Sequence, residues 1–443
     1  MVQPCFWSNP PNLATQACQG PLTTNDSYSC TAGVAYTVNA AGGVLANDYN
    51  FNTGTALTAW LVANPSNGTL RLNRDGSFTY TGFSAGTDTW NYNAFDGVDY
   101  SGTPGTVTMT VTSSAVHNVI AGLDNGVIAY STNLGSSWSV SGVLASGLCC
   151  TSLIADDNGT VFAGLSDVWN FSLLPQIWKS TDHGATWSYV KTLTDATDST
   201  YGAPLQIGGG VNMGGGKLMF SAGGSVGGSL LYNSSDNGVT WSSGVIFPLH
   251  TGLIQGYGSN RLFNVGGGWI LHNGISNSHI SYSNDYGSTW TVTAYDITGN
   301  WFSFARLANG NILSSNQYAL YQSVDNGVSW TSINTSGSAK NKTIISANGG
   351  TVTLGYGNLS VVVSTDGGAT FGSPVTVDAG QTQNKVGCLL YLHTGVLLAA
   401  STHGQAVGTQ LAKVYASNDN GTTWGSGVSP DGTQTNIFCL IET

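Results

Sequence analysis

The sequence predicts an all-β protein in which one small unit is repeated. Gly supplies 61 of the 443 residues and only 7% of residues are charged, a composition typical of strands joined by many turns. An eight-residue phrase of the form S-x-D-x-G-x-T-W, clearest at Ser180 to Trp187, recurs every 40 to 54 residues. A repeat of this period indicates one supersecondary unit that stacks on its neighbours. The copies begin at Ser131, Ser180, Ser234, Ser283, Ser323, Ser364 and Ser417.

Each copy, which we call the turn phrase, reads as a hairpin turn. The Asp carboxylate accepts hydrogen bonds from N–H groups of the turn, the Gly supplies a positive φ, and the Trp ring is buried between neighbouring sheets. Asn133 replaces Asp in the first copy and Phe371 replaces Trp in the sixth. We therefore interpret the acidic residues as structural and predict no catalytic residue among them. They are Asp182, Asp236, Asp285, Asp325, Asp366 and Asp419.

The turn phrase resembles the Asp-box, or BNR repeat, of sialidases, sortilin-type receptors, some glycoside hydrolases and photosystem assembly factors. The resemblance covers residues 118–443, and seven copies imply a seven-bladed β-propeller with one four-stranded sheet per blade. The first repeat lacks its innermost strand, whereas residues 435–441 resemble the strand at 386–392 of the last full repeat. We predict that this C-terminal strand completes the first blade and closes the ring, which removes free sheet edges.

Residues 22–113 read as a small β-sandwich. Alternating runs such as 77–80 and 106–111 are separated by turn signals such as Asp75-Gly76. The segment resembles the cadherin-like, immunoglobulin-type domains of bacterial adhesins and phage virions. Members often carry an acidic stretch that could hold calcium, but residues 48–54 offer one carboxylate, Asp48. Calcium is therefore left open, and no other cofactor is expected.

The proline-interrupted residues 1–21 are interpreted as an N-terminal docking arm, with a frayed tail as the alternative. Residues Met1 to Trp7 lack the basic and apolar regions of a secretory signal peptide. A net charge of −11 without a basic cluster argues against nucleic-acid binding, and no apolar run is long enough for membrane insertion. The seven cysteines match no zinc spacing, and we interpret those of the propeller as free buried thiols.

The residues available for catalysis favour a non-enzymatic protein. The resemblance to sialidases implies a site in which three arginines bind the carboxylate of the substrate and a glutamate assists catalysis. The propeller contains only Arg261 and Arg306, and its one glutamate is Glu442. A polysaccharide-cleaving glycosidase needs two convergent carboxylates, which the sequence alone does not place together. His250, His272 and His279 fit no metal spacing, so no metal site is predicted.

Aromatic residues in loops suggest glycan binding, because exposed rings stack on sugars. The loops at 167–176 and 194–205 are the favoured positions, since loops on a rigid scaffold carry binding. Many of the aromatic side chains must instead belong to the core. The candidates for glycan contact are Trp169, Trp178, Tyr201, Trp269 and Trp301.

The types of module, the acidic surface with few charges and the missing signal peptide together favour a bacteriophage virion protein, extracellular after host lysis. We expect residues 1–113 to bind other virion proteins and the propeller to recognise a host surface glycan or receptor, as in a tail fibre or tail-tip component. A homo-oligomer is left open. The alternatives are a capsid decoration or head-fibre protein, a signal-less secreted bacterial adhesin, and a glycosidase.

Overall fold

A computed structural model describes the chain as an all-β protein, as predicted. The regular elements of the described residues are strands and two 3-10 turns, η1 (Ala40–Gly42) and η2 (Asp124–Gly126), and none is a helix that could span a membrane. Most of the predicted docking arm, residues 1–19, lies outside the described residues. The structure describes residues 20–52, 54–112, 117–196, 205–223, 229–247, 262–273, 279–296, 303–315, 319–333, 344–348, 350–381, 384–403 and 410–443.

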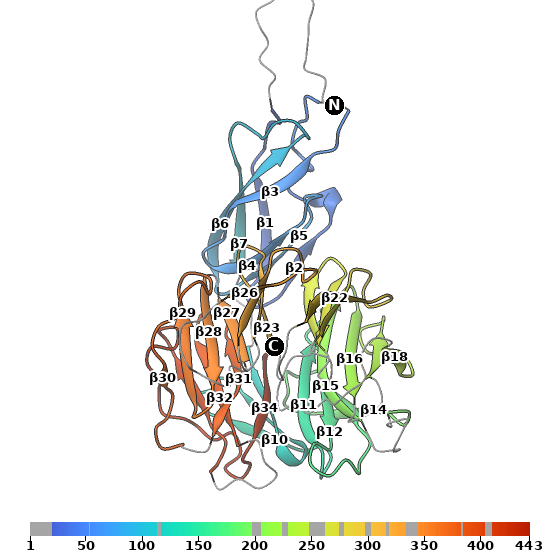
Figure 1. Cartoon of the computed structure of the whole chain (residues 1–443), viewed down its shortest axis with the longest axis vertical. Helices are drawn as coiled ribbons and strands as arrows, with labels where there is room; N and C mark the ends of the chain where they lie inside the picture. Colours follow the sequence, from blue (N-terminus) through green and yellow to red (C-terminus); the bar gives the residue numbers. More distant parts are fainter. Residues whose placement is uncertain are drawn as a thin grey trace, which may run out of the picture.

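The N-terminal strands form two packed sheets, with orders β1-β7-β6-β3 and β2-β5-β4 (Figure 1). Alternate side chains of β5 and β6 point inward because successive residues of a strand face opposite sides. Phe78, Tyr80, Trp90 and Tyr92 are completely or almost completely buried in the resulting core. The predicted immunoglobulin-like sandwich is confirmed. Its strands are β1 (Asp26–Thr31), β2 (Tyr36–Val38), β3 (Thr58–Ala63), β4 (Gly68–Leu72), β5 (Phe78–Gly82), β6 (Gly86–Phe95) and β7 (Gly105–Thr112).

The remaining strands form a β-propeller of small antiparallel sheets that follow one another along the chain (Figure 1). The described residues contain seven such sheets, six with four strands and one with three. Their strands are β8 (Val119–Leu123), β9 (Val127–Ser131), β10 (Ser139–Val143), β11 (Cys149–Ala155), β12 (Val161–Ser166), β13 (Gln176–Ser180), β14 (Ser188–Thr192), β15 (Gln206–Gly214), β16 (Lys217–Gly223), β17 (Ser229–Ser234), β18 (Val245–Phe247), β19 (Leu262–Gly266), β20 (Trp269–Asn273), β21 (His279–Ser283), β22 (Thr291–Asp296), β23 (Ser303–Arg306), β24 (Ile312–Ser315), β25 (Leu320–Ser323), β26 (Thr331–Ile333), β27 (Ile344–Asn348), β28 (Thr351–Tyr356), β29 (Ser360–Ser364), β30 (Val375–Thr376), β31 (Lys385–Tyr391), β32 (Leu397–Thr402), β33 (Val414–Ser417) and β34 (Ile437–Glu442).

The C-terminal strand β34 belongs to the first of these sheets, whose order is β10-β9-β8-β34. It pairs antiparallel with β8, so that Cys439 lies opposite Gly122 and Glu442 opposite Val119. The backbone N–H and the side-chain amide of Asn436, just before the strand, donate to Asp124 at 2.9 and 3.0 Å. The predicted pairing of the C-terminal strand with the first repeat is confirmed.

The turn phrase has the same hydrogen bonds in each copy that contains Asp. In the second copy, Ser180 Oγ and the Thr186 N–H both donate to Asp182 Oδ1 at 2.8 Å, and Thr186 Oγ1 donates to Oδ2 at 2.5 Å. Gly184 has a φ of +90°, and a Cβ there would lie 2.6 Å from Ile120 of the preceding sheet. The phrase therefore requires Gly both for its backbone conformation and for close packing between sheets.

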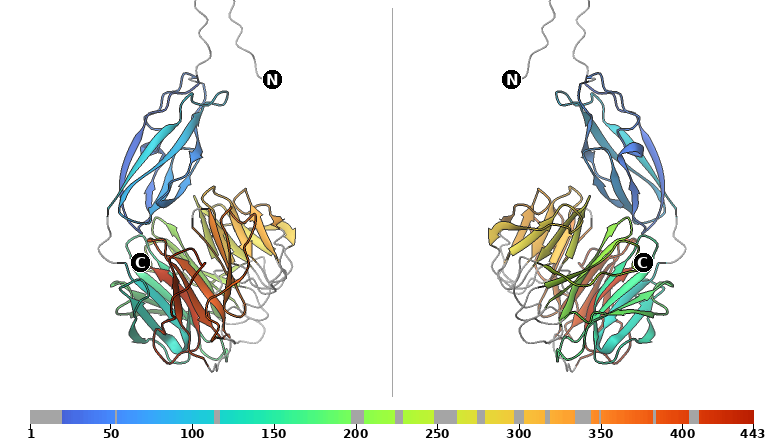
Figure 2. Two further views of the ribbon diagram at one scale, coloured as in Figure 1. Left: turned by 90° about the vertical axis from the view of Figure 1, so that its left-hand side faces the viewer. Right: turned by 90° about the vertical axis from the view of Figure 1, so that its right-hand side faces the viewer.

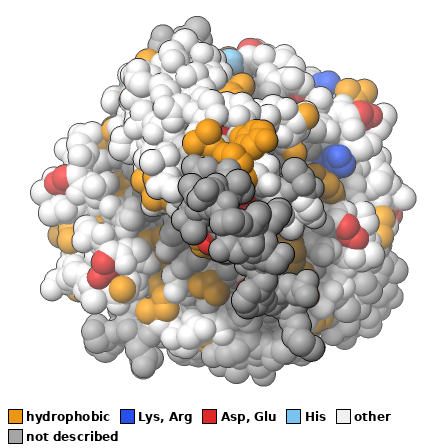
Figure 3. Space-filling view, turned by 90° about the horizontal axis from the view of Figure 1, so that it is seen from above, with side chains coloured by type: hydrophobic (Ala, Val, Ile, Leu, Met, Phe, Trp, Pro, Cys, Tyr) orange, Lys and Arg blue, Asp and Glu red, His pale blue; other side chains and the backbone are white. Residues whose placement is uncertain are grey.

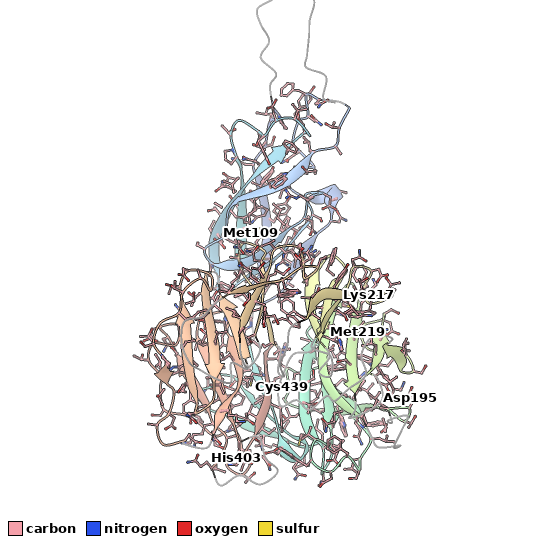
Figure 4. All side chains as sticks on the ribbon, in the orientation of Figure 1. Met109, Asp195, Lys217, Met219, His403 and Cys439 are labelled. Atoms are coloured by element: carbon pink, nitrogen blue, oxygen red, sulfur yellow. The ribbon has the colours of Figure 1, made fainter. Side chains whose placement is uncertain are left out.

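The sandwich covers one end of the propeller (Figure 2). In the sheets after the first, the turn between the first and second strands and the turn phrase lie at the same end, as the hydrogen bond from Tyr286 N–H to Gly268 O at 3.0 Å illustrates. Lys217, which begins β16, lies at the end that faces the sandwich, whereas His403, just after β32, lies at the opposite end (Figure 4). This arrangement places the hairpin turns of several sheets beneath the sandwich.

Candidate functional site: the cleft between sandwich and propeller

A cleft of about 840 Å³ separates the sandwich from the propeller. Strands β2, β4 and β5 form its upper wall, and the turns after β11, β15 and β19 form its floor. Its volume falls in the size range of small-molecule sites. Its lining residues are Ala35, Thr37, Val38, Asn39, Arg71, Asn73, Asp75, Ser77, Phe78, Thr79, Asp157, Asn212, Met213, Gly214, Gly215, Lys217, Asn264, Gly266, Gly267, Trp269, Tyr286 and Asn326.

Two aromatic side chains line the floor of the cleft. Trp269 is half-buried, and its ring stacks on Tyr282 with centroids 5.6 Å apart and planes inclined by 25°. Tyr286 is 41% exposed, and Lys217 Nζ lies 4.6 Å from the centroid of its ring. The Trp ring is thus held rigidly by its neighbour, and a rigid aromatic face costs little conformational entropy when a ligand stacks on it.

Arg71 lines the cleft with a positive charge, and the buried Arg306 lies behind it. Arg71 projects from β4 against the β19–β20 turn, since a Cβ on Gly266 would lie 2.1 Å from its Nη1. Burial lowers the pKa of Arg71 to about 10, and burial followed by the nearby charge of Arg71 lowers that of Arg306 to about 10. Arg306 Nη1 donates to Val265 O at 2.6 Å, while its Nε has no hydrogen-bond partner.

None of the ion pairs in the described part of the chain includes Arg71, Lys217 or Arg306. Of these three cations, Arg71 and Lys217 line the cleft and can contact an anionic ligand there. A partly desolvated charge gains more from such a partner than an exposed charge does.

The two carboxylates of the cleft are engaged in local structure. Asp75 accepts hydrogen bonds from the Ser77 N–H at 3.0 Å and the Ser77 hydroxyl at 2.6 Å. Asp157 accepts from Asn212 Nδ2 at 2.9 Å and from the Gly216 N–H at 3.2 Å. Asp75 therefore stabilises its own turn, and Asp157 joins its turn to the neighbouring sheet. The cleft offers an aromatic face, amide groups and cations, a set suited to binding a polyhydroxylated anion.

The structure separates the predicted glycan-contact residues. Trp269 lies in the cleft. Trp169 follows β12 at the opposite end of the propeller, where its ring lies 6.3 Å from that of Phe438. Trp178 lies on β13 and packs edge-on against Tyr189 at 5.6 Å. Tyr201, Trp301 and part of the predicted 194–205 loop lie outside the described residues.

Arg71, Lys217, Tyr286 and Asn264 were not predicted as site residues from the sequence. Two signals were present: the chain has only 11 Lys and Arg residues, and Gly runs at 214–216 and 266–268 mark turns that approach another surface closely. What the sequence did not contain was the placement of the sandwich over those turns.

The aspartates of the turn phrases do not converge on a common site. Each carboxylate bonds within its own turn, as in Asp236, which accepts from Thr240 Oγ1 at 2.6 Å and from the Thr240 N–H at 2.9 Å. These hydrogen bonds, together with one from Ser234, lower the pKa of Asp236 to about 2. Hydrogen bonds from Thr423 and Ser417 do the same for Asp419. The geometry is that of a repeated structural turn.

The stretch considered for calcium turns its single carboxylate inward. Asp48 accepts from the Thr24 N–H at 2.7 Å and from the Tyr92 hydroxyl at 3.0 Å. Burial, and then the charge of Asp48, raises the pKa of the neighbouring Asp26 to about 6. The five described cysteines carry no disulfide, and Cys150 and Cys439 approach to 4.0 Å between their sulfur atoms.

The comparisons with known proteins concern the fold. The Bacterial Ig domain family matches residues 19–114. Among curated proteins, none matches the sequence significantly. Similar solved structures include YCF48 from Cyanidioschyzon merolae, with 14% identity over 63% of this chain and 84% of that chain and a TM-score of 0.45.

Two similar structures are glycoside hydrolases. The GH74 xyloglucanase from Xanthomonas campestris shows 17% identity over 64% of this chain and 46% of that chain, with a TM-score of 0.48. The α-L-arabinanase from Penicillium chrysogenum shows 15% identity over 61% of this chain and 93% of that chain, with a TM-score of 0.41. At this level the similarity says nothing of a ligand or a reaction.

Proposed function

We propose that this chain is a non-enzymatic structural protein of a bacteriophage that presents a seven-bladed Asp-box propeller for recognition of a host surface glycan. Its N-terminal region would attach it to other virion proteins, as in a tail fibre or tail-tip component. The observation that carries the proposal is the cleft, where Trp269 and Tyr286 lie beside Arg71 and Lys217. We infer that the preferred glycan bears carboxylate or phosphate groups, because these cations have no carboxylate partner among the described residues.

Contacts between the first and last sheets support a closed ring of seven blades. One buried cluster contains Val119 and Ala129 of the first sheet together with Leu398 and Val414 of the last. Strand β34 contacts both β31 and β11, and Arg306 on β23 bonds to Val265 on β19. Such a ring is a rigid platform, and loops and turns on a rigid platform are suited to recognition.

The far tip of the sandwich supports attachment through the N-terminal region. Seen from above, hydrophobic side chains gather in one patch at the end of the sandwich (Figure 3). Leu22, Tyr49, Phe51, Val98 and Tyr100 are 47 to 61% exposed at this tip. Exposed apolar residues in one patch are typical of a protein–protein contact. The tip lies away from the cleft, so that attachment there leaves the cleft accessible.

Glycan binding can be tested with an array of bacterial polysaccharides that carry uronic acids, phosphate groups or no charge. We expect the full chain to prefer the acidic members and to bind more weakly as salt increases. Lys217→Gln and Trp269→Ala should each reduce affinity about tenfold or more, whereas Trp178→Ala, which lies outside the cleft, should not. Equal binding to all three classes, or a loss only with Trp178→Ala, would refute the assignment of the cleft.

The viral location and the lack of catalysis need separate measurements. Gold-labelled antibody to the propeller should mark phage tails; label over heads would favour the decoration role, and label on intact bacteria the secreted adhesin. Polysaccharides that bind on the array should keep their chain length after prolonged incubation with the protein, as judged by size-exclusion chromatography. Shortened products would establish a glycosidase and overturn the non-enzymatic proposal.

A further inference from the structure

A cluster of three metal-binding side chains lies at the junction of the sandwich and the propeller, apart from the cleft. His117 precedes β8, His393 lies in the turn between β31 and β32, and Glu442 lies in β34. One potential ligand atom from each residue lies within 4.8 Å of the other two. The C terminus is close to the base of the sandwich (Figure 2), where the Thr443 N–H donates to Asn118 O at 3.0 Å.

The local interactions leave the ring of one member of the cluster without a well-formed hydrogen bond. Glu442 accepts from the His393 N–H at 2.8 Å and forms an ion pair with His393 Nδ1, and both side chains are only 13 to 14% exposed. The His117 ring stacks on that of His393 with centroids 3.8 Å apart. Both ring nitrogens of His117 are buried, and neither forms a hydrogen bond of good geometry, although backbone groups of Thr443 and Ala32 lie near the ring.

The ion pair between His393 and Glu442 gives the ring nitrogens of His117 no partner. Burial of an imidazole without a well-formed hydrogen bond is unfavourable, because the lost hydration of its nitrogen atoms is not fully replaced. Coordination of a cation would give one ring nitrogen of His117 a strong partner and would use the electron pairs of His393 and Glu442. Two imidazoles and one carboxylate are a donor set typical of zinc and related divalent transition metals, and calcium and magnesium prefer oxygen ligands.

We propose that His117, His393 and Glu442 bind one divalent transition metal ion, zinc in the first instance. The ion would join the segment that enters the propeller, the strand that ends it and a turn of the neighbouring sheet. It would also fix the sandwich, because Gly33 packs so closely on His117 that a Cβ there would lie 2.2 Å from its Cε1. The inference is independent of glycan binding.

The test uses the full chain, freed of metal with EDTA and then titrated with Zn²⁺ by isothermal titration calorimetry. We expect one Zn²⁺ per chain and a melting temperature that rises with Zn²⁺ concentration, because a ligand of the folded state stabilises it. His117→Gln and His393→Gln should each weaken binding at least about tenfold and abolish the Zn²⁺-dependent rise. Co²⁺ should give visible absorption bands in the wild-type chain that Zn²⁺ removes.

The matched control is His403→Gln, which changes a histidine at the opposite end of the propeller (Figure 4). It should bind Zn²⁺ like the wild-type chain. Near-ultraviolet circular dichroism in EDTA shows whether each variant is folded, so that lost binding is separated from misfolding. The proposal is overturned if the wild-type chain binds no stoichiometric Zn²⁺, or if folded His117→Gln binds as tightly as His403→Gln.

Discussion

Deletion of residues 436–443 should destroy the cooperative folding of the propeller. Ile437 and Phe438 are 0% and 1% exposed, and Leu440 and Ile441 are partly buried. Complete burial of one such side chain contributes about 1.5–3 kcal/mol. With the two partly buried side chains counted at half weight, the four together contribute about 5–9 kcal/mol as an upper estimate. The deletion also removes Asn436, the partner of the buried Asp124. This loss is comparable to the whole stability of a typical domain, about 5–15 kcal/mol.

The deletion also leaves β8 as an unpaired strand edge, which favours association between chains. Urea unfolding followed by tryptophan fluorescence and size-exclusion chromatography with light scattering measure the two effects. Phe438→Ala serves as a milder version and should cost about 3–5 kcal/mol. Val239→Ala is the control, because Val239 is 74% exposed and its truncation should change stability by less than about 0.5 kcal/mol. A monomeric truncated chain with an unchanged urea midpoint would refute the role assigned to β34.

Three further substitutions test the sandwich and the turn phrase. The pKa of Asp26 is raised to about 6 in the folded chain, so the protonated carboxyl group stabilises the fold fully below pH ~4, and this stabilisation is lost as pH rises through 6. Asp26→Asn removes the buried charge and should raise the melting temperature at pH 7.5 but not at pH 4. An equal change at both pH values would contradict this. Asp325→Ala should lower the free energy of unfolding in urea by about 1 kcal/mol, a value that allows for the partial exposure of Asp325. The substitution removes the hydrogen bonds from Ser329 that lower the pKa of the carboxyl group. No change would argue against a structural role. Gly238→Ala should cost about 1–3 kcal/mol, since a Cβ would lie 2.2 Å from the Phe162 ring at a φ of +72°, and it should exceed the cost of Gly432→Ala, which has a positive φ but no neighbour within 4 Å.

The turn phrase was predictable because its interactions are local. Ser180, Asp182 and Thr186 bond to one another within seven residues, so the identity of the side chains determines the turn wherever the phrase occurs. The strand pattern of the sandwich was predictable for the same reason, since alternation of inward and outward side chains is a property of each strand by itself. The pairing of β34 with β8 was a long-range prediction, and it succeeded because a repeat that lacks a strand requires one from elsewhere.

The candidate sites were not predictable in this way. Trp269 was singled out for its type, but Trp178 and Trp169 were equally eligible, and only the position of the sandwich distinguishes them. Arg71 of the sandwich reaches the β19–β20 turn of the propeller. No local sequence pattern encodes such a contact between the two.

By itself, the sequence determined the all-β class, the repeated turn and the strand that joins the two ends of the propeller segment, because propensity, alternation and side-chain capping act over a few residues. Tertiary structure alone decided which cations share a cleft and that His117, His393 and Glu442 meet. Those contacts depend on how sheets are stacked and how the sandwich is seated, and these are set by packing over the whole chain rather than by any one segment.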